Sequence, residues 1–186
     1  PAVVYVGSND GMLHAFLAET GEELWGYLPQ VVLPKLELLT DPDYCRSAYV
    51  DLSPRAYDVK LAGRWRTGLF GGQRTGGDSY FALDVTDPHA PDVLWETRVP
   101  TMGASYTDPV LVHTNNGPML WVGSGPNELG EAWSSAIDLA TGTVLWNLRL
   151  STITGVNAAT AATPYDADFD GVADALGDAD GDRLAG

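Results

Sequence analysis

The chain has little positive charge. Its 186 residues include 10 Lys and Arg against 25 Asp and Glu, which gives a net charge of −15 at pH 7. Nucleic-acid binding needs clustered Lys and Arg that neutralise phosphates, so this charge balance argues against a nucleic-acid partner. An acidic surface is compatible instead with solubility and with the binding of cations.

Cysteine and long apolar runs are also scarce. Cys45 is the single cysteine, so no disulfide can form within the chain, although a partner outside this sequence stays possible. No apolar run approaches the ~20 residues that a transmembrane helix needs, so we expect no membrane-spanning segment. The sequence begins at Pro1 without a Met or a signal peptide, and we expect that processing or truncation removed the true N-terminus.

Turn-forming and aromatic residues are plentiful by contrast. The chain contains 21 Gly, 12 Pro, 6 Trp and 8 Tyr, and these residues separate short aromatic and β-branched runs. Such a pattern is typical of an all-β protein. The one good helical candidate is the short stretch Val32–Asp41.

Three segments repeat one pattern, and they end at Trp25, Trp95 and Trp146. Each contains an apolar strand that ends in Gly, a turn, and a second strand in which Ala precedes an apolar residue. A Thr-Gly or Asp-Pro turn and a Leu-Trp pair follow. The second and third segments have a further strand on their N-terminal side, so the unit is a four-strand meander of roughly 50 residues.

Four-stranded antiparallel sheets repeated at this period predict a β-propeller. The chain opens in the second strand of one blade, completes two blades and stops in the next after its second strand, which makes about three and a half blades. A propeller closes with roughly 4–8 blades, so we interpret residues 1–186 as one partial propeller domain. The three tryptophans are expected to pack between blades. The repeat-like segments are 3–29, 48–99, 107–150 and 160–186.

The last repeat contains the stretch DADFDGVAD, residues 166–174. It falls where the second and third blades have ordinary turns between their first and second strands, at Asp58–Trp65 and Val112–Met119. Calcium takes 6–8 oxygen ligands, and alternating side chains of a tight loop can converge on one ion. The carboxylates occupy positions 1, 3, 5 and 9, with Gly171 at position 6. The predicted ligands are Asp166, Asp168, Asp170, the carbonyl of Val172, and Asp174.

The loop resembles an EF-hand loop but lacks one of its parts. Position 12 is Gly177 instead of a bidentate Glu, and no helix is expected on either side. Magnesium fits less well because it demands stricter geometry, and a redox metal would need His or Cys nearby. An acidic turn that is merely solvated is the alternative, but four aspartates packed without a cation would repel one another.

A second acidic cluster follows, with Asp178, Asp180 and Asp182. Its segment Leu176–Gly181 aligns with Val6–Gly11, which reads as an ordinary hairpin turn. We therefore interpret these aspartates as turn residues, although Asp178 could still be a remote ligand.

No catalytic constellation stands out in the sequence. His14, His89 and His113 form no metal-binding spacing; His14 is expected in the core or between blades, and the other two in solvent. Ser134-Ser135 lacks the GxSxG context of a nucleophile elbow. The glycine-rich Gly71–Gly77 precedes a strand and reads as a connecting loop. The sequence therefore predicts a protein that is not an enzyme.

Taken together, these motifs resemble the C-terminal β-propeller of the type IV pilus biogenesis and tip-adhesin family, of the PilC/PilY type. The likeness rests on VVYVGSNDGMLHAF, ETGEELWGYLP, WRTGLFGG followed by YFALDVTDP, and DADFDGVAD, and it covers essentially the whole chain. The family is similar in carrying one calcium loop with four aspartates, which correspond to Asp166, Asp168, Asp170 and Asp174.

The resemblance implies a surface or secreted protein that supports pilus assembly, opposes retraction and contributes to adhesion and twitching motility. Its expected partners are pilins or minor pilins, and a host or abiotic surface. Two alternatives stay open. A quinoprotein dehydrogenase propeller commonly uses a vicinal cysteine pair, which one cysteine cannot supply. An integrin-like or outer-membrane assembly scaffold would usually carry the Asp loop in several consecutive blades.

Overall fold

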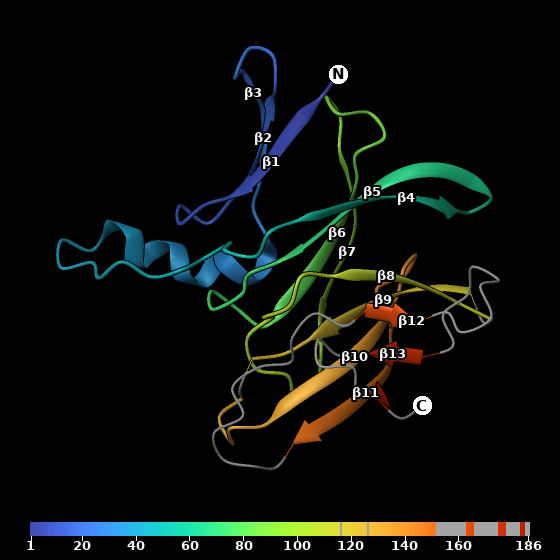
Figure 1. The fold of residues 1–186 in the computed structure, drawn as a ribbon. Helices are drawn as coiled ribbons and strands as arrows, with labels where there is room; N and C mark the ends of the chain where they lie inside the picture. The colour runs from blue at the N-terminus through green and yellow to red at the C-terminus, as the bar shows by residue number, and fades with distance from the viewer. Residues whose placement is uncertain (116, 126, 152–162, 166–174, 178–182, 185–186) are drawn as a thin grey trace.

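The computed structural model describes residues 1–115, 117–125, 127–151, 163–165, 175–177 and 183–184. They form four antiparallel sheets and one helix, and the strands of each sheet neighbour one another in chain order (Figure 1). The all-β class predicted from the turn-rich sequence is confirmed. The second and third sheets are the predicted four-stranded meanders, and the first and fourth contain three described strands each. The prediction that the chain stops after the second strand of its last blade is wrong, because Arg183–Leu184 adds a third strand to that sheet.

The strands of the four sheets have the following bounds. The first sheet contains β1 (Val3–Gly7), β2 (Leu13–Leu17) and β3 (Glu23–Tyr27). The second contains β4 (Arg55–Leu61), β5 (Arg64–Gly72), β6 (Ser79–Asp84) and β7 (Asp92–Arg98). The third contains β8 (Val110–Thr114), β9 (Gly117–Gly123), β10 (Ala132–Asp138) and β11 (Val144–Ser151). The fourth contains β12 (Thr163–Tyr165), β13 (Ala175–Gly177) and β14 (Arg183–Leu184).

The second sheet is buried on both faces. Successive side chains of a strand point to opposite faces, and in β6 this alternation divides the residues between two cores. Phe81 and Leu83 belong to the cluster shared with the first sheet, together with Leu13 and Leu69. Tyr80 and Ala82 belong to the cluster shared with the third sheet, which also contains Ile137. The first three sheets therefore stack face to face in chain order, as successive blades do.

Tryptophans of the last strands join neighbouring sheets. The Trp25 indole of β3 donates a hydrogen bond of 2.8 Å to the carbonyl of Pro88 in the second sheet. The Trp95 indole of β7 is 7% exposed and donates one of 3.0 Å to the carbonyl of Leu139 in the third sheet. The predicted packing between blades is thus confirmed for both. Trp146 is 38% exposed, and its predicted contact would involve a sheet whose side chains lie outside the described residues.

The expected helix is present but is not an α-helix. Residues Gln30–Thr40 form a 3₁₀ helix, η1, with Pro34 inside it. Proline has no N–H and its ring clashes with the carbonyl four residues back, so the α-helical ladder cannot run through this point. Val32 is fully buried against the first two sheets, while Leu33 and Leu38 are exposed. Cys45 lies in the connection between η1 and β4, and its thiol is free and exposed.

Two equivalent glycines offer a matched test of the packing between sheets. Gly21 and Gly142 both follow Thr in the turn before a last strand, with φ of 73° and 71°. A Cβ at Gly142 would lie 2.7 Å from Trp95 Cγ, whereas a Cβ at Gly21 would meet nothing within 4 Å.

We expect Gly21→Ala to lower the free energy of unfolding by about 1–2 kcal/mol, the cost of a left-handed non-glycine residue. Gly142→Ala should lose a further ~1–3 kcal/mol because the new methyl group overpacks against Trp95. Urea denaturation of both variants and the wild type measures the difference. Equal losses in the two variants would contradict the inter-sheet packing described above.

Candidate functional site

The fourth sheet frames the predicted calcium loop. β12 and β13 pair antiparallel, and Tyr165 lies opposite Ala175, so residues 166–174 form the connection between two paired strands. This is the hairpin position that the repeat pattern predicts. The five predicted ligands fall on this connection and lie outside the described residues. Their convergence on an ion therefore stays a prediction. The residues are Asp166, Asp168, Asp170, Val172 and Asp174.

The corresponding connections of the second and third sheets are short. In the second sheet Leu61 pairs with Arg64, so the turn consists of Ala62 and Gly63, with φ of 48° and 79°. In the third sheet Thr114 pairs with Gly117, which leaves two residues for the turn. Both predicted hairpin turns are confirmed. The connection at residues 166–174 is thus longer than those of the two preceding sheets.

The second acidic cluster has an ordinary counterpart in the first sheet. Gly177 pairs with Arg183 in the fourth sheet just as Gly7 pairs with Leu13 in the first, so both connections contain five residues. Asp178, Asp180 and Asp182 lie outside the described residues. In the first sheet Asp10 occupies the position of Asp180, and its carboxylate accepts a 3.0 Å hydrogen bond from the Met12 N–H. In the first sheet an aspartate at this position therefore accepts a hydrogen bond within its own turn.

The imidazole of His14, a residue of β2, lies between two carboxylates. Its Nδ1 lies 2.6 Å from Glu23 Oε1, and its Nε2 lies 2.9 Å from Asp10 Oδ2. The hydrogen bond with Glu23, aided by Asp10, raises the pKa of the imidazole despite its partial burial. The prediction of a core or inter-blade His14 is therefore only partly right, because its side chain is 14% exposed and its partners lie within its own sheet. His89 and His113 are exposed, as predicted.

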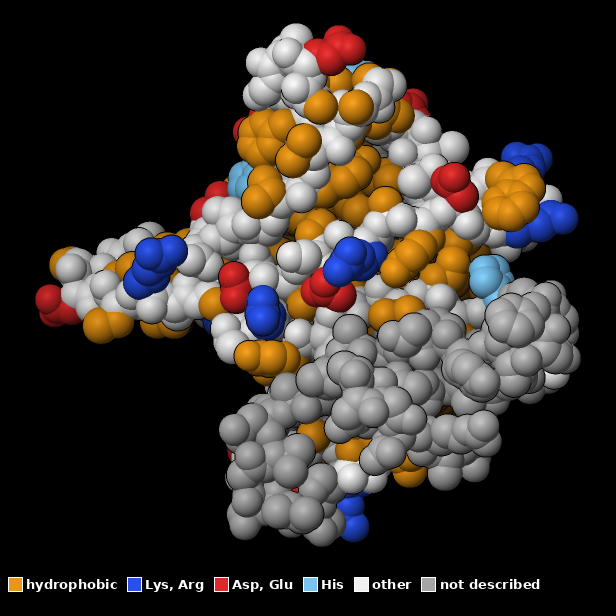
Figure 2. Space-filling view, in the orientation of Figure 1, with side chains coloured by type: hydrophobic (Ala, Val, Ile, Leu, Met, Phe, Trp, Pro, Cys, Tyr) orange, Lys and Arg blue, Asp and Glu red, His pale blue; other side chains and the backbone are white. Residues whose placement is uncertain are grey.

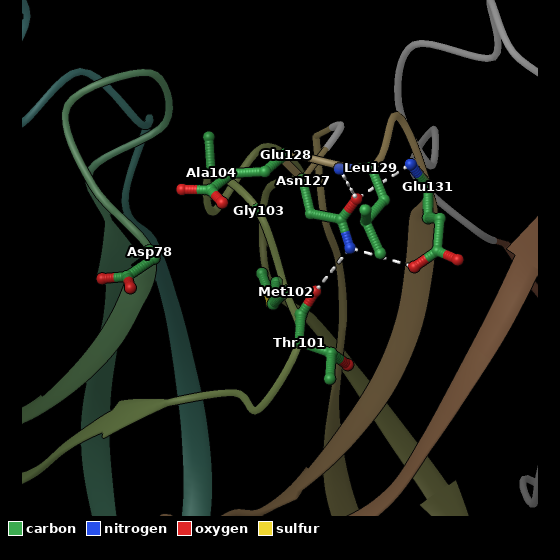
Figure 3. Close-up of a pocket in the computed structure, with 9 residues that line it drawn as sticks. All are labelled: Asp78, Thr101, Met102, Gly103, Ala104, Asn127, Glu128, Leu129 and Glu131. Carbon is green, nitrogen blue, oxygen red and sulfur yellow. Dashed lines mark hydrogen bonds between the residues drawn. The ribbon is translucent and has the colours of Figure 1, made fainter.

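An open pocket of about 560 Å³ lies where three connections meet (Figure 3). Its walls are Asp78 of the β5–β6 connection, residues 101–104 before β8, and residues 127–129 and 131 of the connection between β9 and β10. Asn127 Nδ2 donates to the Thr101 carbonyl and to Glu131 Oε2, both at 3.1 Å. The hydrogen bond from Asn127 and the ion pair with Arg149 lower the pKa of Glu131. The pocket wall is therefore acidic, and hydrogen bonds between its own residues fix its shape.

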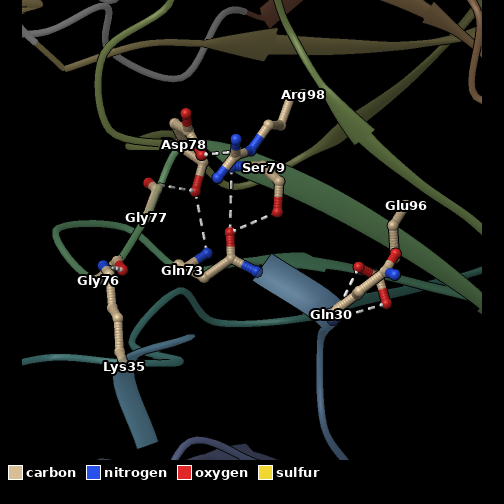
Figure 4. A network of polar contacts seen from close by, with 10 residues as sticks. Gln30, Lys35, Gln73, Gly76, Gly77, Asp78, Ser79, Glu96 and Arg98 are labelled. Atoms are coloured by element: carbon tan, nitrogen blue, oxygen red, sulfur yellow. Dashed lines mark hydrogen bonds and ion pairs between the residues drawn. The ribbon is translucent and has the colours of Figure 1, made fainter. Parts of the chain in front are cut away.

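A polar network attaches η1 to the second sheet (Figure 4). The Glu96 carboxylate of β7 accepts hydrogen bonds from the Tyr27 hydroxyl at 2.5 Å and from the Gln30 N–H at 2.9 Å. Lys35 Nζ donates to the Gly76 carbonyl at 2.5 Å. Gly76 thus lies in the loop before β6, as predicted, but Gly71 and Gly72 of the same glycine-rich stretch belong to strand β5 and pair with β6, so the predicted loop is shorter than Gly71–Gly77. The sequence analysis missed Glu96, because nothing in a strand pattern shows that its partner starts a helix 66 residues earlier.

The described residues contain no second candidate for a metal site. Among them, no group of three His, Cys, Asp or Glu side chains is arranged so that it could hold a metal ion. Within the same part of the chain, no helix has the length and apolarity that crossing a bilayer demands. The loop at residues 166–174 is therefore the candidate that the pattern of the sequence favours.

Comparison with known proteins gives a consistent result. The family model described as the PilY1 beta-propeller domain matches residues 1–184. The type IV pilus biogenesis factor PilY1 of Pseudomonas aeruginosa (strain PAO1) is 41% identical over 180 residues, which cover 92% of this chain and 15% of that protein. A PilY1 homolog of Xylella fastidiosa is 40% identical over 148 residues, which cover 75% of this chain and 12% of that protein. The chain thus spans a small part of these relatives.

A solved structure has the same fold. The crystal structure of the Pseudomonas aeruginosa PilY1 C-terminal domain matches with a TM-score of 0.78 and 36% sequence identity, over 94% of this chain and 35% of that chain. The predicted β-propeller fold is confirmed by this match. The chain corresponds to about a third of that domain.

The His14 cluster makes the stability of the fold depend on pH. Because its folded-state pKa is raised above the unfolded value of about 6.5, the folded state binds the proton more tightly than the unfolded state. The stabilisation is fully present below about pH 6.5 and is lost as the pH rises through the folded pKa. We expect His14→Gln to remove this part of the pH dependence.

Urea denaturation of the wild type and of His14→Gln across this pH window measures the effect. His89→Gln is the matched control, because His89 is exposed and has no side-chain hydrogen bond among the described residues. If the His14→Gln and wild-type curves keep the same slope with pH, His14 does not carry the linkage.

Proposed function

The chain belongs to the PilY1 β-propeller family, and on that premise we propose that it is a non-enzymatic, calcium-binding propeller of the type IV pilus machinery. The proposed calcium binding rests on one observation: a connection with alternating aspartates joins two paired strands. Tyr165 and Ala175 close a connection of nine residues, with carboxylates at its positions 1, 3, 5 and 9. The two preceding sheets use two-residue turns at the same place.

Calcium provides a physical reason for this loop. Two carboxylates ~4 Å apart repel each other by about 1 kcal/mol in water, and by more where the local dielectric is lower. No positive side chain occurs between residues 166 and 174 to offset this repulsion. A bound cation removes it, and binding to the folded state alone stabilises the fold by RT ln(1 + [L]/Kd). Without a bidentate Glu at position 12, we expect a Kd of about 10⁻⁴ to 10⁻⁶ M, suited to an extracellular module.

In this proposal calcium acts on one connection of the propeller and biases it between an ordered and a less ordered form. That switch would affect how the pilus machinery extends and retracts its fibre, and hence twitching motility. The partners would be pilins or minor pilins, and the site of action the cell surface or the periplasm. Both relatives are type IV pilus biogenesis factors by name, and this supports the pilus role over an enzymatic one.

The two alternative functions have less support. A quinone-dependent dehydrogenase commonly uses a vicinal cysteine pair, and the chain has Cys45 alone. An integrin-like scaffold usually repeats its Asp loop in successive blades. Here the equivalent connections in the second and third sheets are two-residue turns, at Ala62–Gly63 and between Thr114 and Gly117.

Isothermal titration calorimetry of the full chain with calcium chloride tests the proposal. The wild type should bind one calcium ion, and Asp168→Ala/Asp170→Ala should abolish measurable binding because it removes two oxygen ligands. The matched control is Asp180→Ala/Asp182→Ala, which removes the same charge from the neighbouring connection and should bind calcium like the wild type. Equal calcium uptake by wild type and Asp168→Ala/Asp170→Ala would show that the loop is a solvated acidic turn.

A further inference from the structure

The β4–β5 hairpin extends beyond the second sheet to which it belongs (Figure 1). β5 pairs with β6 only from Gly68 onward, where Gly68 lies opposite Asp84. Arg64, Trp65 and Arg66 therefore pair with β4 alone. The part of the hairpin from Lys60 to Arg66 is called the hairpin tip below. Its Lys60, Arg64 and Trp65 side chains are exposed, whereas Leu61 packs into the core and Arg66 pairs with Asp84 of β6.

The hairpin tip ends in a regular two-residue turn and is anchored by its first strand. Ala62 and Gly63 both have positive φ, the geometry of a two-residue turn whose twist matches that of the flanking strands. Val59 and Leu61 are 3% and 8% exposed, because they pack into the core between the second and third sheets. Binding at the tip would thus cost little conformational entropy, since the backbone is already ordered.

An exposed aromatic ring and unpaired cations meet at the hairpin tip. Trp65 is 71% exposed, more than any other aromatic side chain in the described part of the chain. It lies directly opposite Lys60, so the two side chains share one face of the hairpin. Arg64 occupies the other face. Figure 2 shows apolar atoms between basic ones at this end of the hairpin.

Only one of the three cations of the hairpin tip forms an ion pair within the described part of the chain. Arg66 forms an ion pair with the buried Asp84, which also accepts hydrogen bonds from Thr86. Lys60 and Arg64 are exposed, and neither forms an ion pair with any described residue. Three of the chain's 10 Lys and Arg thus lie within seven residues of a chain whose net charge is −15. A local cationic site on an acidic molecule favours an anionic ligand.

We propose that the hairpin tip docks a short acidic segment of a partner polypeptide. An aromatic or aliphatic side chain of that segment would cover the Trp65 ring, and its carboxylates would pair with Lys60 and Arg64. Tryptophan and arginine are the residues most enriched among those that dominate binding energy at interfaces. This proposal goes beyond the calcium-binding role and does not depend on it.

A peptide segment suits the tip better than a larger anionic surface. An anionic bilayer would bring the acidic body of the chain, net charge −15, toward its headgroups as well as the tip. A single-stranded nucleic acid needs a basic groove along its backbone, and two unpaired cations do not make one.

Fluorescence anisotropy with a fluorescein-labelled peptide, in which glutamates flank one central phenylalanine, tests this proposal on the full chain. The wild type should bind the peptide saturably, and less tightly as the KCl concentration rises. Trp65→Ala and Arg64→Glu should each raise Kd by at least about tenfold, the loss expected for a residue that dominates an interface. The matched controls are Leu129→Ala and Arg46→Glu, which change an exposed apolar side chain and an exposed cation elsewhere, and should change Kd by less than about twofold.

Three results would overturn the proposal. One is no saturable binding by the wild type. Another is a Kd for Trp65→Ala and Arg64→Glu that matches those of the two controls. The last is tighter binding to phosphatidylglycerol vesicles or to an oligothymidine than to the peptide. Because Trp65 and Arg64 are exposed, the variants should unfold at the wild-type urea concentration, which separates loss of binding from loss of fold.

Discussion

The contact between the last strand of one sheet and the following sheet underlies the rest of the structure. Trp25 and Trp95 each reach across to a backbone carbonyl of the next sheet, and Trp95 also lies against the turn that contains Gly142. A sheet whose two faces are both buried against neighbouring sheets is stabilised mainly by that packing, and its hairpin connections contribute little to its stability. Its connections can therefore change in length and charge while the cores stay the same.

The connection between the first two strands carries very different residues in two of the sheets. In the second sheet the turn between the first two strands is short and ends a projecting tip with an exposed tryptophan and two unpaired cations. In the fourth sheet the same connection has nine residues, four of them aspartates. Both follow from a scaffold whose stability lies in packing between sheets, so that binding residues can sit on loops held by rigid strands.

Much of this fold could be predicted from the sequence, because the repeat is visible in it. The register that aligned Leu176–Gly181 with Val6–Gly11 agrees with the pairing of Gly177 with Arg183 and of Gly7 with Leu13. What the sequence did not reveal depends on contacts between distant residues. The 3₁₀ form of η1 follows from Pro34 locally, but its attachment through Glu96 does not. The aspartate pattern located the candidate site. The exposure of Trp65 could not be predicted, because its strand also contains buried apolar residues and the pattern does not distinguish the two.

The central claim is that the connection at residues 166–174 is a calcium site on a β-hairpin. A crystal structure of the chain grown with saturating calcium chloride tests it most directly. The account predicts one ion with oxygen ligands at about 2.3–2.6 Å, supplied by side chains of Asp166, Asp168, Asp170 and Asp174 and by the Val172 carbonyl. A well-ordered loop with no ion, or a calcium ion bound elsewhere with these carboxylates facing solvent, would contradict it.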